Sequence, residues 1–112
     1  MADPNDPGDW RVDSTKAQAL ARIGELRDAI DEIDAELVVL LNRRASQALE
    51  IGRIKKVLQM EIYQPSREEA VLRHVRGLNP GPLDADAVAR LFERIIDEAR
   101  RLERTTAEHS ES

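Results

Sequence analysis

The sequence has no cysteine, and aromatic residues make up only 3% of its 112 residues. Without cysteine, a disulfide framework, a thiolate zinc site and a thiol nucleophile are all excluded. No apolar run approaches the roughly 18 residues that a membrane-spanning helix needs. The net charge of -5 argues against a nucleic-acid partner, whose phosphates attract basic proteins. The acidic, proline-containing N-terminus is unlike a signal peptide, so we expect a cytoplasmic protein with no membrane partner.

Apolar and charged residues, 41% and 35% of the chain, alternate with helical spacing. Between residues 16 and 59, apolar positions recur at alternating three- and four-residue intervals, which is typical of one long helix with a single apolar seam. The seam contains Ile23, Leu26, Ile30, Ile33, Leu37, Leu40, Arg44, Ala48, Ile51, Lys55 and Leu58. Gly52 lies inside this helix, and we expect it to let another group approach the backbone closely.

Two shorter helices are predicted after the first. Pro65 suits the first turn of a helix that ends near Gly77, and Asp84 is a good N-cap for a third helix. The buried face predicted for the third helix comprises Val88, Leu91, Phe92, Ile95, Ile96, Ala99 and Leu102. We therefore predict an all-α domain of three helices over residues 16–104, with flexible tails at residues 1–15 and 105–112.

The length of the first helix predicts a second copy of the chain. A helix over residues 16–59 would be about 60 Å long, whereas a domain of this size has a radius of gyration of about 13 Å. The helix would extend beyond its own chain, and its apolar seam would face water unless something covers it. A homodimer is the simplest solution, because two-fold pairs are the commonest assemblies.

Two cations occupy the seam where apolar residues are expected. Arg44 and Lys55 are eleven residues apart, which places them on the same helix face within roughly 20°. Burying two like charges is costly without compensating anions. Either both side chains reach the edge of the seam and pair with glutamates, or they bind a small anionic molecule. Spacing alone leaves these alternatives open.

Other charged residues lie where they could join such a site. Glu103 continues the apolar face of the third helix, where it would pair with a cation or hold a proton, unless it is solvated at the helix end. Arg67 and Glu68 open the second helix and could point into a cleft or serve as ordinary caps. Arg27 lies about 100° around the helix from Arg44, so it could serve the pocket of a partner chain. His74 and His109 show no metal spacing, and no metal or cofactor motif is present.

In order and spacing, five segments resemble the all-helical class of chorismate mutase. The segments are LRDAID at 26–31, LLNRR at 40–44, IGRIK at 51–55, YQPSRE at 63–68 and LFERII at 91–96. The resemblance covers about residues 23 to 103. It implies a three-helix protomer that intertwines with a second copy, and two active sites that each take an arginine from the other subunit.

The activity implied by the resemblance is rearrangement of chorismate to prephenate, a step toward phenylalanine and tyrosine, without a cofactor. Lys55, Glu103 and Arg44 would be the catalytic residues. Arg44 and Arg27 of the partner subunit would grip the substrate carboxylates, with Arg67 supporting them. Lys55 would contact a carboxylate and the ether oxygen.

The remaining site residues implied by the resemblance are Gln64, Glu68, Ala99 and Glu103. Glu68 would hold the ring hydroxyl and Glu103 would donate to the ether oxygen, which requires a proton on its carboxyl. Gln64 stands where an aspartate is frequent in the family, and Ala99 where a small hydroxyl residue often assists.

Two alternatives stay open from the sequence. An isochorismate pyruvate-lyase resembles this family in fold and site, and a non-catalytic helical dimer could act as a regulatory subunit. Docking to another shikimate-pathway enzyme is also compatible with the sequence.

Overall fold

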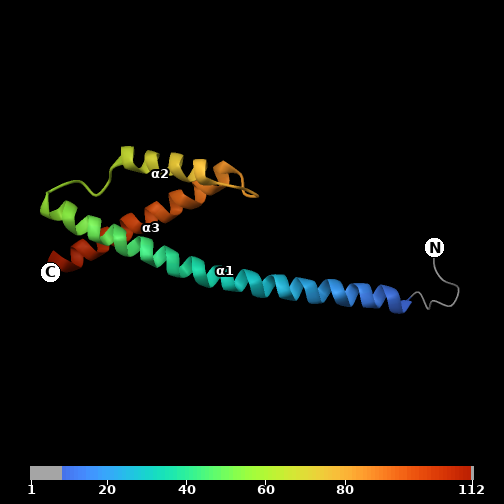
Figure 1. Ribbon diagram of the computed structural model, residues 1–112. Helices are drawn as coiled ribbons and strands as arrows, with labels where there is room; N and C mark the ends of the chain where they lie inside the picture. Colours follow the sequence, from blue (N-terminus) through green and yellow to red (C-terminus); the bar gives the residue numbers. More distant parts are fainter. Residues whose placement is uncertain (1–8, 112) are drawn as a thin grey trace. The chain divides into compact units, whose positions relative to one another are not determined.

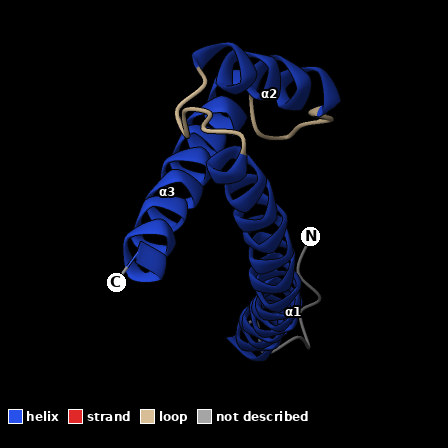
Figure 2. Cartoon of the chain, turned by 90° about the vertical axis from the view of Figure 1, so that its left-hand side faces the viewer, coloured by secondary structure: helices blue, strands red, loops and turns tan. Residues whose placement is uncertain are grey.

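A computed structural model of the chain describes residues 9–111, with side chains described from residue 14 to residue 108. It contains three helices, α1 (Asp9–Val57), α2 (Pro65–Leu78) and α3 (Ala85–Glu111), joined by two loops (Figure 1). Figure 2 shows only helix and loop over the described residues, which confirms the predicted all-α fold of three helices. No helix in the described part of the chain is long and apolar enough to cross a membrane.

Helix ends follow local chemistry where the sequence provides it. Pro65 occupies the start of α2, and the Asp84 Oδ1 atom accepts a hydrogen bond of 2.7 Å from the backbone N–H of Ala87, which confirms the predicted cap. At the end of α1, Gln59 adopts a left-handed φ of 58°. The N–H of Met60 then donates to the carbonyl of Lys55 at 2.8 Å, so the helix ends at Val57 and not at the predicted residue 59.

Two helices are longer than predicted. The first begins at Asp9 instead of residue 16, and the third continues to Glu111 instead of ending near residue 104. Neither 9–15 nor 105–111 contains glycine or proline, so nothing in either segment interrupts the backbone hydrogen bonds of the adjoining helix. The rest of the predicted tails, residues 1–8 and 112, lies outside the described residues.

The chain divides into two compact units, Met1–Val39 and Leu40–Ser112. In the first unit, the described chain is the N-terminal part of α1, and its apolar seam is uncovered. Exposed seam side chains there include Ile23, Leu26, Ile30, Ile33 and Leu37, which are 42% to 54% accessible. The prediction that the seam of this helix faces solvent in a single chain is confirmed for these residues.

In the second unit, α2 packs along α3 (Figures 1 and 2). Val75 on α2 and Ala89 on α3 are the buried apolar residues of the described chain. Most of the face predicted for α3 is half-buried, but Leu91 and Leu102 are 55% and 39% exposed, so their predicted burial is wrong for the single chain. Periodicity identifies an apolar face but does not supply the neighbour that covers its edges.

Candidate active site

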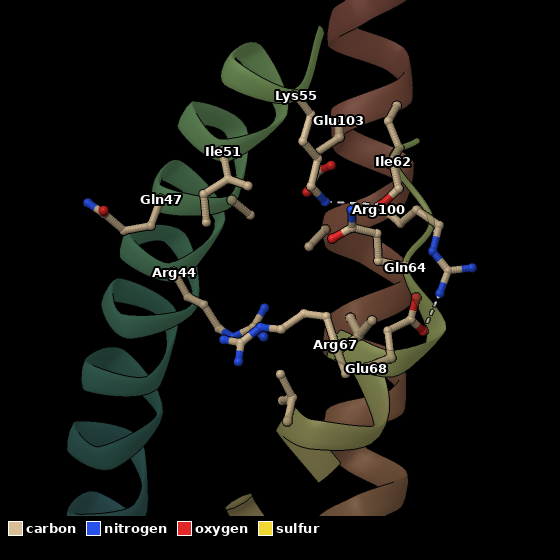
Figure 3. Close-up of a pocket in the computed structure, with 14 residues that line it drawn as sticks. Arg44, Gln47, Ile51, Lys55, Ile62, Gln64, Arg67, Glu68, Arg100 and Glu103 are labelled. Carbon is tan, nitrogen blue, oxygen red and sulfur yellow. Dashed lines mark hydrogen bonds and ion pairs between the residues drawn. The ribbon is translucent and has the colours of Figure 1, made fainter. Parts of the chain in front are cut away.

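The second unit contains a cavity of about 410 Å³ lined by side chains from all three helices and the α1–α2 loop (Figure 3). Seven of the eight predicted site residues line it: Arg44, Lys55, Gln64, Arg67, Glu68, Ala99 and Glu103. The eighth, Arg27, lies on α1 in the other unit, is exposed, and does not line the cavity of this single chain. Residues far apart in the sequence therefore meet in one place.

The two seam cations of α1 both reach this cavity from the same face of the helix. The Lys55 ammonium donates a hydrogen bond of 3.2 Å to the backbone carbonyl of Ile62, which fixes its position near the end of the helix. Arg44 is half-buried and forms no ion pair with any residue that the structure describes. Pairing with a glutamate therefore does not account for Arg44, and its charge is left for a ligand.

The first turn of α2 presents its side chains to the cavity. The backbone carbonyl of Gln64 accepts hydrogen bonds from the N–H groups of Arg67 at 3.1 Å and Glu68 at 3.2 Å. Figure 3 shows Arg44 and Arg67 reaching into the cavity from α1 and α2. Arg67 also lacks an ion pair among the described residues. The capping interpretation of Arg67 and Glu68 is incomplete, because both side chains line the cavity.

Glu103 on α3 packs against the backbone of α1 at Gly52. A Cβ atom added at Gly52 would lie 3.3 Å from the Cγ atom and 3.4 Å from the Oε2 atom of Glu103. The predicted close approach at this glycine is therefore confirmed. The Oε2 atom of Glu103 is buried without a hydrogen-bond partner among the described residues.

Burial raises the pKa of Glu103 above its ordinary value, and the positive charges of Lys55 and Arg100 oppose part of this rise. Desolvation is the larger effect, because the carboxyl loses water on packing against the α1 backbone. A protonated carboxyl in this position could donate a hydrogen bond into the cavity, as a carboxylate could not.

Arg100 is a cavity residue that the sequence did not reveal. Its guanidinium forms an ion pair with Glu68 and lies 4.6 Å from the centre of the Tyr63 ring. One indication was available, since Arg100 lies four residues after Ile96 and three before Glu103 on the same helix. A position with that spacing shares the face that bears both of them.

The charges of the cavity favour an anion. Four positive side chains, Arg44, Lys55, Arg67 and Arg100, line it together with two acidic ones, Glu68 and Glu103. The pKa of Glu103 is raised toward the neutral form, and Glu68 is already paired with Arg100. Apolar walls at Ile51, Val71 and Ile96 strengthen electrostatic attraction inside. A small anion would supply the compensating charge that the cavity itself lacks.

The described residues contain no group of three or more histidine, cysteine, aspartate or glutamate side chains placed to hold a metal ion. The cavity is built for charge recognition by arginine and lysine, with one carboxyl able to hold a proton.

The chain is similar to a described protein family and to several known proteins. Residues 26–104 match the family described as chorismate mutase type II. The chain is 49% identical over 78 residues to a bifunctional chorismate mutase/prephenate dehydratase of Neisseria gonorrhoeae, covering 70% of this chain and 21% of that protein. It is 27% identical over 94 residues to a chorismate mutase of Methanocaldococcus jannaschii, covering 83% of this chain and 95% of that one.

The fold is similar to that of a solved chorismate mutase (form II) of Thermus thermophilus. The TM-score is 0.73 at 35% sequence identity, covering 74% of this chain and 94% of that chain. The chain spans only 21% to 25% of the length of the bifunctional relatives that it matches. The family match nevertheless extends over residues 26–104, which is more than half of the sequence. This chain belongs to the chorismate mutase type II family.

Proposed function

We propose that this chain catalyses the rearrangement of chorismate to prephenate in the biosynthesis of phenylalanine and tyrosine. The observation that carries the proposal is the cavity in which three helices bring cations around a carboxyl whose pKa is raised. Chorismate is a dicarboxylate with an ether oxygen and a ring hydroxyl, and this set of charges and donors complements it.

The reaction is an intramolecular pericyclic rearrangement, so the chemistry calls for no nucleophile, general base or redox cofactor. The enzyme accelerates it by holding the substrate in the compact conformer whose reacting carbons are close. Negative charge develops on the ether oxygen as the C–O bond breaks, and fixed donors at that point lower the barrier. Both effects require rigidly placed cations and donors.

Four cations contact the substrate in the proposed complex. Arg44 binds one substrate carboxylate, supported by Arg67 from α2. Arg27 of the partner subunit also binds a substrate carboxylate and reaches the site from the other chain. Lys55, held near the cavity by its hydrogen bond to the Ile62 carbonyl, contacts both a carboxylate and the ether oxygen.

Two acidic side chains and two uncharged ones complete the proposed site. Protonated Glu103 donates to the ether oxygen alongside Lys55, and Glu68 accepts a hydrogen bond from the ring hydroxyl. Gln64 lies beside Glu68 and offers an amide where an aspartate is frequent in the family. Ala99 contributes only van der Waals contact, so the hydrogen bond that a hydroxyl residue could make there is missing.

The proposed active form is a homodimer with shared sites. The exposed seam of α1, which includes Leu26, Ile30 and Ile33, supports it, since these side chains have no cover in the single chain. The small buried core supports it as well, since no large side chain of the described chain is fully buried. A second copy would cover the seam and bring its own Arg27 to the cavity.

The product of the proposed reaction could pass to a further enzyme of the same pathway. The bifunctional relatives are named for both a chorismate mutase and a prephenate dehydratase activity. We propose that the prephenate made here passes to another enzyme of the same pathway, which could dock to this chain. Co-purification with that enzyme would test the docking.

Conversion of chorismate by the purified protein tests the main proposal. We expect loss of the chorismate absorbance and formation of prephenate, identified by mass and by its acid-catalysed conversion to phenylpyruvate. Isochorismate is supplied in a parallel assay. Release of pyruvate from isochorismate without turnover of chorismate would assign the lyase activity instead, and no turnover of either would favour a non-catalytic dimer.

Substitution of the seam cations tests the site. We expect Arg44→Ala and Lys55→Ala each to lower kcat/KM by at least about a hundredfold, because each removes a charge-assisted contact to the dianion. Arg43→Ala is the matched control, since Arg43 is exposed on the same helix and does not line the cavity. Near-normal turnover in either site variant would show that the substrate binds elsewhere.

A further inference from the structure

The guanidinium of Arg100 contacts three side chains. It donates to the Oε1 atom of Glu68, its Cζ atom lies 4.6 Å from the centre of the Tyr63 ring, and its Nη2 atom lies 3.5 Å from Asp97. The side chains of Arg100 and Glu68 are only 21% and 25% exposed. An ion pair of this low exposure is less screened by water than one on the surface.

These contacts join three parts of the chain at one edge of the cavity. Tyr63 comes from the loop before α2, Glu68 from the first turn of α2, and Arg100 from α3. Arg100 and Glu68 line the cavity, whereas Tyr63 does not. The Tyr63 ring therefore restricts the guanidinium from outside the cavity. The ion pair between Arg100 and Glu68, drawn as a dashed line in Figure 3, restricts the carboxylate that faces a ligand.

Glu68 needs such a restraint. It lies beside Arg67, and both share the cavity with Arg44, either of which could attract its carboxylate. Arg100 engages the Oε1 atom, which leaves Oε2 as an acceptor for a donor on the ligand. A carboxylate with one oxygen fixed has lost most of its freedom before the ligand arrives, so binding costs less entropy.

We infer that Arg100 is a positioning residue that orients Glu68 to accept the hydrogen bond of the substrate's ring hydroxyl, with Tyr63 orienting Arg100. The inference rests on the proposed function. Its Nη2 atom contacts both Glu68 and Asp97, and its Cζ atom lies over the ring of Tyr63, so the role that we assign to Arg100 is exerted through Glu68. It determines selectivity for a ring that carries a hydroxyl.

A double-mutant cycle on kcat/KM for chorismate tests this. We expect Arg100→Met to lower kcat/KM by about tenfold in the wild-type background, but by less than about twofold in the Glu68→Gln background. Arg101→Met is the control, because Arg101 is the exposed neighbour on the same helix. Equal losses in both backgrounds would overturn the inference, since they would mean that Arg100 acts without Glu68.

A substrate analogue separates positioning from general stability. With the chorismate analogue that lacks the ring hydroxyl, Arg100→Met should lower kcat/KM by less than about twofold, because Glu68 then has no donor to meet. A purely structural role would lower turnover of both substrates equally and would overturn the inference. Wild-type protein that converts neither substrate would instead overturn the proposed function and, with it, this inference.

Variants of Tyr63 provide a second test of the inference, which does not depend on Arg100→Met being folded. Tyr63→Phe keeps the ring and should retain selectivity between the two substrates, whereas Tyr63→Leu removes it and should lower the ratio of their kcat/KM values by about threefold. Circular dichroism and melting temperature establish that each variant is folded. Unchanged selectivity in folded Tyr63→Leu would show that the ring does not orient Arg100.

Discussion

The ionisation of a single carboxyl, Glu103, depends on two opposing surroundings. Packing against Gly52 removes water from it and raises its pKa, while Lys55 and Arg100 attract its negative form. Desolvation is the larger effect, so the neutral form persists to a higher pH than for an ordinary glutamate. In the proposed reaction only that neutral form can donate to the ether oxygen.

The pH profile of catalysis should report this proton. We expect kcat/KM for chorismate to fall as pH rises through the raised pKa of Glu103, because the ionised carboxylate repels the charge developing on the ether oxygen. Glu103→Gln, whose amide donates at every pH, should flatten the profile over that window. A profile of unchanged shape in this variant would exclude Glu103 as the titrating donor.

The free energy of unfolding should change with pH in the same direction as kcat/KM. The native state binds this proton more tightly than the unfolded state, so the stabilisation is complete below the ordinary glutamate pKa and is lost as pH rises through the raised pKa.

Periodicity alone predicted only those candidate site residues that break an apolar pattern. Arg44 and Lys55 are conspicuous because they interrupt an apolar seam, and Glu103 because it continues one. Arg100 breaks no pattern, since an arginine at the edge of an apolar face is ordinary on a surface helix. Its role depends on Glu68 and Tyr63, which are 32 and 37 residues away along the chain and meet it only after α2 has packed on α3.

At the scale of elements, the contact between α1 and α3 depends on one residue without a side chain. At 3.3 Å from a Gly52 Cβ, the Cγ atom of Glu103 would have to shift by a few tenths of an ångström. In the proposed complex, a shift of that size would move the carboxyl relative to the ether oxygen, and positioning errors on this scale impair catalysis.

Gly52→Ala should therefore lower kcat more than it raises KM, by about tenfold in kcat. The same change favours the helix by about 1 kcal/mol, so we expect little loss of stability. Gly77→Ala is the control, because nothing lies within 4 Å of a Cβ at Gly77. Steady-state kinetics and thermal melting of both variants provide the measurement. Full activity in Gly52→Ala would show that Glu103 tolerates the displacement.

The backbone just after α1 is strained at Gln59, and a substitution can relieve this strain. Gln59 has a φ of 58°, a region that glycine adopts readily and other residues do not. Gln59→Gly should raise the free energy of unfolding by roughly 1 kcal/mol, measured by denaturant titration at fixed protein concentration. Gln59→Ala retains the strained φ and should give no gain. Equal stability of the glycine and alanine variants would contradict this account.

The sequence predicted helix boundaries well only where a specific interaction sets them. Pro65 and Asp84 begin helices for local reasons that the sequence displays. The N-terminus of α1 and the C-terminus of α3 have no such marker, so the predicted ends at residues 16 and 104 stopped short of Asp9 and Glu111. Polar composition alone does not terminate a helix that lacks glycine and proline.

At the scale of the whole molecule, sharing of the proposed site between subunits predicts that two inactive variants restore activity when they are mixed. Arg27→Ala and Arg44→Ala should each inactivate the homodimer, because each removes one cation from both sites. Co-refolding the two variants in equal amounts produces mixed dimers in which one site carries both changes and the other carries none. We expect recovery of about a quarter of wild-type activity, since half of the dimers are mixed and each has one intact site.

Recovery of that size requires two chains at each site. A mixture as inactive as its parents would contradict the sharing of Arg27 between subunits. Unmixed variants refolded in parallel measure the background, and size-exclusion chromatography verifies that the mixed sample contains dimers.

The scarcity of buried side chains has a consequence for the protein in a cell. With Val75 and Ala89 as the interior of the described chain, folding and pairing in the proposed homodimer would be a single bimolecular event. The fraction of working enzyme then depends on abundance, and at low expression activity falls faster than the number of chains. In that case a newly made chain without a partner would expose α1 to proteases, and we expect unpaired copies to be degraded faster than paired ones.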